Sequence, residues 1–176
     1  TAMGFETTAS GSTSTAMGQS TTASGYASTA MGYETTASGS RSTAMGRYTT
    51  ASGDRSTAMG DATEASGNAS TAMGDETIAS GYGSTAMGAS TTASEYASTA
   101  MGQSTTASGK ASTAMGSATI ASDYGSLVIG QYNSSGSSAT SADSFNTANT
   151  AFVIGNGVDS SNISDAFSIL FDGTTN

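Results

Sequence analysis

The most constraining feature of this 176-residue sequence is the spacing of its methionines. The chain contains nine methionines, and each lies fourteen residues after the one before it. A fixed period of this kind indicates a repeat protein, in which each unit stacks on the next and contacts only its neighbours. The row comprises Met3, Met17, Met31, Met45, Met59, Met73, Met87, Met101 and Met115.

Each repeat consists of two five-residue pieces, and a variable pair of residues follows each piece. The unit at residues 28–41 reads STAMG, then YE, then TTASG, then SR. Alternation within a piece is typical of a short β-strand, and Gly followed by a variable pair is typical of a tight turn. Glu95 and Asp123 replace the Gly that ends the second piece, so we expect these two turns to differ from the others.

Stacked parallel strands explain the repeat better than helices or isolated hairpins. Gly every seven residues and abundant Ser and Thr disfavour a helix. Isolated hairpins would not explain why successive units are nearly identical. The sequence therefore predicts an all-β parallel β-roll, or β-solenoid, of fourteen-residue turns, in which about nine turns at roughly 4.8 Å spacing form a rod about 43 Å long.

The alternation within the pieces also predicts which residues face inward. We expect the alanines inside a narrow roll, together with the Gly residues, the Ser of STAMG and the first Thr of TTASG, because small side chains let two sheets approach closely. The predicted core comprises Ala16, Ala23, Ala30, Ala37, Ala44 and Ala51, with Val128 and Val153 towards the C-terminus.

The methionines would then form a row on the outer face of one sheet, and Ile129 extends it because it lies fourteen residues after Met115. An exposed apolar row of this length marks an interface. Burying each methionine would contribute about 1.5–3 kcal/mol per turn, so we expect identical chains to associate along it. The alternative is a monomer with methionine inside and alanine outside.

Two further sets of residues are candidate binding surfaces. Aromatic residues such as Tyr26 and Tyr33 occupy the variable pairs, where they could bind a partner or pack over neighbouring turns. The outer face of the second sheet would carry hydroxyl groups, which form either an ordinary β-surface or an ice-binding ladder that Glu64, Ile78 and Ile120 interrupt. This outer face comprises Thr8, Ser10, Thr22, Ser24, Thr36, Ser38, Thr50 and Ser52.

Composition excludes several function classes. Thirteen acidic residues oppose four basic ones, and this net charge of -9 argues against binding nucleic acid or anionic lipid. The chain contains no His and no Cys, so a Ser-His-Asp or Cys-His site cannot form. We expect no enzyme activity, no metal and no cofactor. No apolar run of about 20 residues exists, so no membrane insertion is expected within this segment.

The pieces STAMG and, at residues 126–130, SLVIG resemble the head repeats of trimeric autotransporter adhesins with YadA-like heads, which read like SVAIG at a similar spacing. The resemblance covers Thr1 to about Gln131. It implies a left-handed roll, assembly as a homotrimer through the methionine row and Ile129, and exposure at a cell surface. It also implies adhesion to an extracellular matrix protein, a glycan or another cell. Handedness and the number three come from the resemblance alone.

The C-terminal part departs from the period. Residues 132–149 break it, and residues 150–157 (TAFVIGNG) and 165–173 (DAFSILFDG) indicate further strands with bulkier side chains. We therefore divide the chain into a repetitive β-roll head, residues 1–131, and an irregular C-terminal cap, residues 132–176. The chain opens within a repeat, so we expect any anchor to lie outside it. The alternative function is a phage-tail-type fibre shaft, or a mechanical spacer, on a virion.

Overall fold

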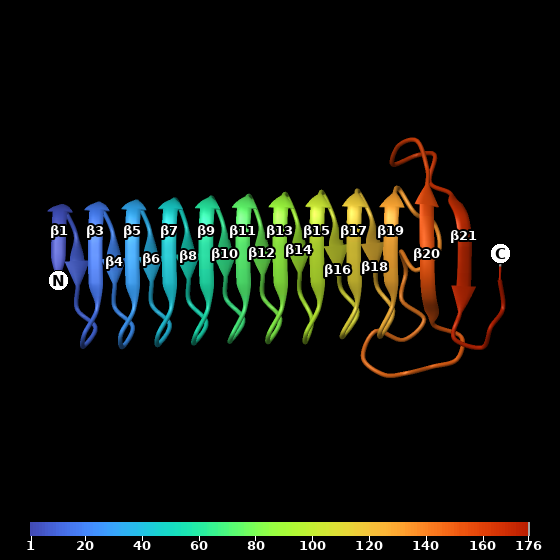
Figure 1. Ribbon diagram of the computed structural model, residues 1–176, viewed down its shortest axis with the longest axis horizontal. Helices are drawn as coiled ribbons and strands as arrows, with labels where there is room; N and C mark the ends of the chain where they lie inside the picture. The colour runs from blue at the N-terminus through green and yellow to red at the C-terminus, as the bar shows by residue number, and fades with distance from the viewer. Residues whose placement is uncertain (176) are drawn as a thin grey trace.

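The computed structural model describes residues 1–175 and shows two parallel sheets facing each other across a thin core (Figure 1). The long sheet has twelve strands and the short sheet has nine, and residues 1–175 contain no helix. Each fourteen-residue repeat contributes one strand to each sheet. The predicted parallel β-solenoid is therefore confirmed.

The long sheet contains β1 (Ala2–Phe5), β3 (Thr15–Gln19), β5 (Thr29–Tyr33), β7 (Thr43–Arg47), β9 (Thr57–Asp61), β11 (Thr71–Asp75), β13 (Thr85–Ala89), β15 (Thr99–Gln103), β17 (Thr113–Ser117), β19 (Leu127–Gln131), β20 (Thr150–Asn156) and β21 (Asp165–Leu170). The short sheet contains β2 (Thr8–Ala9), β4 (Thr22–Ala23), β6 (Thr36–Ala37), β8 (Thr50–Ala51), β10 (Glu64–Ala65), β12 (Ile78–Ala79), β14 (Thr92–Ala93), β16 (Thr106–Ala107) and β18 (Ile120–Ala121).

The strands pair in exact repeat register. Met31 of β5 lies beside Met17 of β3 and Met45 of β7. In Figure 1 the long-sheet strands from β1 to β20 point up in front, and the short-sheet strands point down behind them while the chain advances to the right. This path is a left-handed coil.

The second strand of each repeat is shorter than the five-residue piece that predicts it. Only the Thr-Ala pair is extended, as in β4. The amides of Ser24 and Gly25 both donate to the carbonyl of Ala37, at 3.0 and 3.3 Å, so the regular ladder ends there. The short sheet therefore holds two residues per turn, and the rest of the piece bends into the corner.

The core is a column of small side chains. The alanines from Ala16 to Ala121, one per strand, are fully buried, and Val128 and Val153 continue the column at the C-terminal end. The Ser of STAMG and the first Thr of TTASG are also buried. Two buried alanines per turn contribute little apolar area, so the backbone ladders carry much of the stabilisation.

The expectation that all Gly residues face inward is wrong for the Gly that follows each methionine. Gly60, for example, is the fourth residue of β9, is solvent-exposed and has φ +128°. A Cβ placed there would lie 1.9 Å from the carbonyl oxygen of Gly74 in the next turn. Neighbouring strands approach too closely at this position for any side chain, which explains why Gly recurs there.

The C-terminal segment resumes the long sheet after an excursion. Strand β20 pairs in parallel with β19, with Ile154 beside Ile129, and β21 then pairs antiparallel with β20. Residues 132–149, where the period fails, form the connection between β19 and β20. The repeat register therefore survives the insertion, and the antiparallel strand ends the stack.

Asp123 joins the last regular turn to this connection. Its fully buried carboxylate accepts hydrogen bonds from the backbone amides of Thr140 at 2.6 Å, Ser141 at 3.1 Å and Thr150 at 2.8 Å. At the equivalent position two turns earlier, the amide of Glu95 bonds to the hydroxyl of Ser98. Both corners keep the backbone hydrogen bond of the other turns, from the Ser98 amide to Glu95 at 3.1 Å and from the Ser126 amide to Asp123 at 3.3 Å. They differ from the Gly corners in their added side-chain contacts, and only Asp123 holds another segment.

Two more side chains at this end form hydrogen bonds with backbone groups that no neighbouring strand pairs. The Asn133 amide accepts from the backbone N–H of Ile120 at 2.8 Å and donates to its carbonyl at 2.9 Å. It thereby satisfies the edge of the short sheet. The Asp165 carboxylate accepts from the amides of Ser134 and Ser135. Partial burial acts to raise the pKa of Asp165, but hydrogen bonds from Ser135 and Ser134 outweigh it and hold the pKa below its ordinary value.

Candidate functional surfaces

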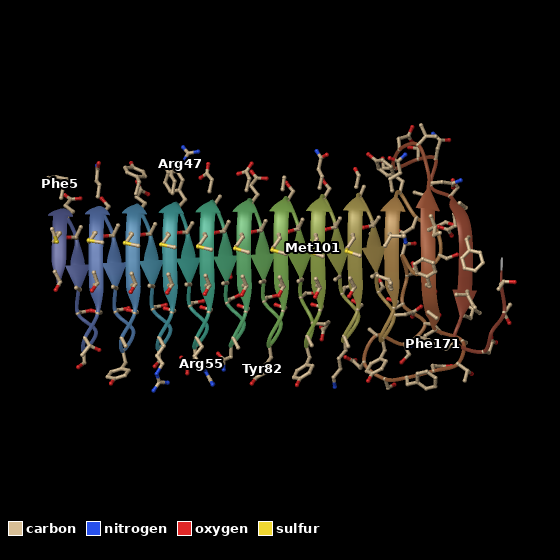
Figure 2. All side chains as sticks on the ribbon, viewed as in Figure 1. Phe5, Arg47, Arg55, Tyr82, Met101 and Phe171 are labelled. Atoms are coloured by element: carbon tan, nitrogen blue, oxygen red, sulfur yellow. The ribbon has the colours of Figure 1, made fainter. Side chains whose placement is uncertain are left out.

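The methionine row lies on the outer face of the long sheet, where its sulfur atoms form a line along the rod (Figure 2). Met3 at the end of the stack is 59% exposed, and the other eight methionines are half-buried in the isolated chain, because each lies beside its neighbours. Ile129 lies beside Met115 and Ile154, and it continues the row.

The methionine row has different neighbours on its two sides. A second row, of Thr residues ending at Leu127, runs beside the methionines on the same face of the long sheet, and these side chains are also half-buried. The Thr side of the row therefore offers apolar and hydroxyl groups, whereas on the other side Arg47, Asp61 and Asp75 end β7, β9 and β11 two residues after a methionine. Such a surface suits packing against a like surface.

The outer face of the short sheet carries the predicted hydroxyl residues. Their serines are exposed, and the threonines from Thr22 to Thr50 are half-buried, whereas Thr8 at the end is exposed. Glu64 and Ile78 lie in the same row and are exposed, and Ile120 is half-buried. The hydroxyl pattern is thus broken along the rod.

The two edges of the flat roll carry the variable pairs. We call the corner that follows each methionine strand the first edge, and the corner that follows each short strand the second edge. Figure 2 labels Phe5 and Arg47 on the first edge and Arg55 and Tyr82 on the second. The second residue of each regular pair has positive φ, such as 49° at Glu34.

Tyrosines on both edges pack against one another over successive turns. On the first edge, the rings of Tyr33 and Tyr48 meet edge to face, with centroids 5.5 Å apart. On the second edge, Tyr82 and Tyr96 stack at 5.4 Å, with Lys110 Nζ 5.5 Å from the Tyr96 ring. The rings nevertheless stay accessible, since Tyr82 and Tyr96 are each 52% exposed.

Charges also gather on the first edge. Arg47 makes a two-pronged ion pair with Asp61 in the next turn. The carboxylate of Glu34, as hydrogen-bond acceptor and as negative charge, raises the pKa of Tyr33 to about 12. Charged side chains of the first edge thus interact with neighbours on the same edge.

A recess of about 350 Å³ lies where the C-terminal segment meets the roll. Ile120 and Thr106 of the short sheet form part of its wall, and Tyr132, Asn133 and Ile163 form another part. Sequence patterns did not predict this recess, because its wall combines the last turns with residues of the C-terminal segment that no repeat relates to them. Its lining mixes apolar groups and hydroxyls without a concentration of charge.

The part of the chain that the structure describes contains no group of three acidic, His or Cys side chains placed to hold a metal ion. Within the same residues, no helix is long and apolar enough to span a bilayer. The candidate functional features are therefore surfaces: the methionine row, the hydroxyl face, the two edges and the recess.

Comparison with known proteins identifies a family whose model matches the chain. The family model described as the YadA head domain repeat, in two copies, matches residues 1–22, 23–49, 51–77, 79–105 and 107–133. A search of curated proteins finds no matching relative. The matched segments cover the whole regular roll and reach Asn133, whose side chain caps the short sheet. Because the match extends over most of the sequence, the chain belongs to the YadA head domain repeat family.

Proposed function

We propose that this chain is a non-enzymatic adhesin head that assembles as a homotrimer through the methionine row and is displayed at a cell surface. The observation that carries the proposal is the row itself: nine methionines and Ile129 in unbroken register on the outside of a roll whose own core is alanine. Membership of the YadA head family supports both the trimer and the adhesin role.

The isolated roll has little apolar core. Its interior buries only alanine and small hydroxyl side chains over nearly all its length. Completing the burial of a half-exposed methionine adds on the order of 1 kcal/mol, which is part of the 1.5–3 kcal/mol for full burial. Repeated over ten turns, this contribution rivals the whole net stability of an ordinary domain, about 5–15 kcal/mol. Assembly and folding should therefore be closely linked.

With the methionine rows turned towards a common axis, the hydroxyl faces of the short sheets would point outward on all three sides. These faces and the accessible parts of the edges would then meet the target, which we propose is a matrix protein, a glycan or another cell surface. Hydroxyl and tyrosine side chains suit such contacts, since they offer hydrogen bonds and flat apolar area.

The assembly is tested by placing charges in the row. Met59→Asp combined with Met73→Asp buries two carboxylates per chain against apolar neighbours, which is strongly unfavourable. We expect the trimer to dissociate or the chain to unfold, as measured by sedimentation velocity and circular dichroism. The matched control is Thr36→Asp with Thr50→Asp, which adds the same charge on the short-sheet face, where Glu64 already stands.

The control should sediment as the unmodified trimer does. If the methionine variant also remained an intact trimer, the interface assignment would be wrong. The adhesin role is tested separately, by measuring binding of the trimer and of the row variant to immobilised matrix proteins, glycans and cells. We expect many-fold weaker retention for the row variant, because three linked copies bind with an avidity that one lacks.

A further inference from the structure

The recess at the C-terminal end of the roll lies beside the outer face of the short sheet. One part of its wall contains Thr106 of β16 and Ile120 of β18, which stand in the outer row of that sheet. The connection after β19 contributes Tyr132 and Asn133, and the loop between β20 and β21 contributes Ile163. Three segments that are distant in the sequence therefore meet around a volume of about 350 Å³.

Hydrogen bonds hold the loop of residues 157–164 against the last regular turn. The amide of Gly157 donates to the carbonyl of Gln131 at 3.1 Å, and the amide of Ser164 donates to the carbonyl of Tyr132 at 3.0 Å. In Figure 1 this loop lies above β20 and bends back towards β19. The part of the wall that the loop forms is thus fixed before any ligand arrives, which reduces the entropy cost of binding.

The part of the wall that the connection forms is fixed in the same way. Asn133 is buried, and its side-chain amide bonds to both backbone groups of Ile120. The hydroxyl of Ser137, which also lines the recess, donates to the carbonyl of Ser134 at 2.7 Å. A largely preformed site with a few fixed polar groups is the usual form of a small-ligand site.

The lining of the recess combines apolar area with hydroxyl groups. The apolar area comes from Ile120, Tyr132 and Ile163, and hydroxyl groups come from Ser104, Thr106 and Ser160. Among the described residues that line the recess, none is acidic or basic. Its volume lies near the lower limit of ordinary ligand sites, about 300–1,000 Å³, so it suits one ring rather than an extended chain.

These properties favour one class of ligand. A charged group would lose its hydration without meeting an opposite charge, which is unfavourable, and the net charge of -9 repels anions. A purely apolar molecule would leave hydroxyl groups of the lining without partners. A neutral pyranose matches both parts of the lining, because its ring carries C–H groups on its faces and hydroxyl groups around its rim.

We infer that this recess binds one uncharged pyranose unit of a glycan. A C–H face of the ring lies against Tyr132 and Ile163, and its hydroxyl groups bond to Thr106 and Ser160. The inference names one target of the proposed adhesin and rests on that role, but the recess lies within one chain and does not require the trimer. A single ring should bind with a Kd on the order of 1 mM, and three recesses on one trimer would strengthen attachment by avidity.

Methyl resonances of isoleucine report on the recess directly. Ile120 and Ile163 line it, whereas Ile78 stands in the same row as Ile120, three turns earlier and outside the recess. The full chain is titrated to about 50 mM with glucose, galactose, mannose or N-acetylglucosamine, and N-acetylneuraminic acid is the charged comparison. We expect at least one neutral sugar to shift Ile120 and Ile163 saturably while Ile78 stays unchanged. If no neutral sugar shifted them, or if the charged sugar bound more tightly, the inference would be wrong.

Two matched pairs of variants test the contacts. Thr106→Arg fills the recess, and its control, Thr50→Arg, places the same side chain in the same row four turns earlier. Ile163→Asp places a charge at the ring, and its control, Val158→Asp, adds that charge to the same loop at a side chain that is 76% exposed. We expect about 10-fold weaker sugar binding for the two recess variants and less than about 2-fold change for the controls. Equal affinities within both pairs would place the sugar elsewhere and overturn the inference.

Failure of this inference can be told apart from failure of the proposed function. Sedimentation and retention on cells are measured on the same unmodified protein. Saturable shifts at Ile120 and Ile163 in a protein that neither trimerises nor adheres would support the recess and overturn the proposed function. An adhering trimer in which these resonances stay unshifted would overturn the recess alone.

Discussion

The regular roll and the C-terminal segment satisfy their backbones in different ways. In the roll, each strand pairs with a copy of itself fourteen residues away, and the side chains that face inward are alanine, serine and threonine. Where the roll meets the C-terminal segment, the side chains of Asp123, Asn133 and Asp165 accept or donate hydrogen bonds in place of another turn. The roll satisfies its backbone hydrogen bonds by repetition, and its C-terminal end does so with specific polar side chains.

This difference shows where each region is sensitive to change. The roll repeats one geometry, so its weak points are the positions where stacked backbones touch. The C-terminal segment is used once, so its weak points are individual hydrogen-bonding side chains. Three substitutions separate these two kinds of dependence.

The largest effect is expected from Gly60→Ala in the roll. The new Cβ would meet the Gly74 carbonyl oxygen at 1.9 Å, and φ at this position is +128°, so we expect a loss of about 4 kcal/mol. Gly83→Ala is the control, since nothing lies within 4 Å of its Cβ and Ala97 adopts the same kind of corner with φ 54°. Urea unfolding followed by circular dichroism measures both, and similar midpoints for the two variants would contradict the close-contact argument.

A smaller loss, about 3 kcal/mol, is expected from Asp123→Ala, because three backbone amides lose their acceptor. Hydrogen exchange should accelerate at Thr140, Ser141 and Thr150, while the amides of the early turns keep their protection. Glu95→Gly is the control and should change stability by less than about 0.5 kcal/mol, since Gly stands at this place in most turns. Uniform acceleration along the rod would show that the two regions unfold as one.

The smallest expected effect is a gain in stability. Thr63 is buried in the roll, and its hydroxyl has no hydrogen-bond partner, like those of the equivalent threonines in neighbouring turns. Thr63→Val removes the unpaired polar atom at nearly constant shape, so thermal unfolding should show a gain of about 1 kcal/mol. Thr50→Val on the outer face should stay within about 0.5 kcal/mol. A loss at Thr63 would show that its hydroxyl is bonded to an internal water.

Much of the roll could be predicted from sequence because its information is local and repeated. The fourteen-residue period and the alternation within STAMG are enough to predict stacked parallel strands, with alanine on one face and methionine on the other. The length of the second strand was overestimated, since the bend at Ser24 and Gly25 depends on a shared carbonyl in the next turn. The inward assignment of Gly60 failed because its backbone, with φ +128°, leaves the regular strand conformation, so strand alternation no longer decides its exposure.

The C-terminal closure was less predictable, since its contacts join residues that no pattern relates. Asp123 was recognised as an altered corner, but nothing in its spacing points to Thr150, which is twenty-seven residues later. The role of Asn133 was not predicted, although it stands where the period expects a buried Thr. That departure from the repeat, an amide in a Thr position, is the signal that could have revealed it.

The sequence by itself determined that the chain is a stack of fourteen-residue turns and that methionine forms one continuous row, because a strict period leaves each residue type in one place on the turn. Only the tertiary structure decided how the corners bend and how the last turn is closed. The physical reason is that these features depend on groups brought together by stacking, at positions where the repeat leaves the residue type free.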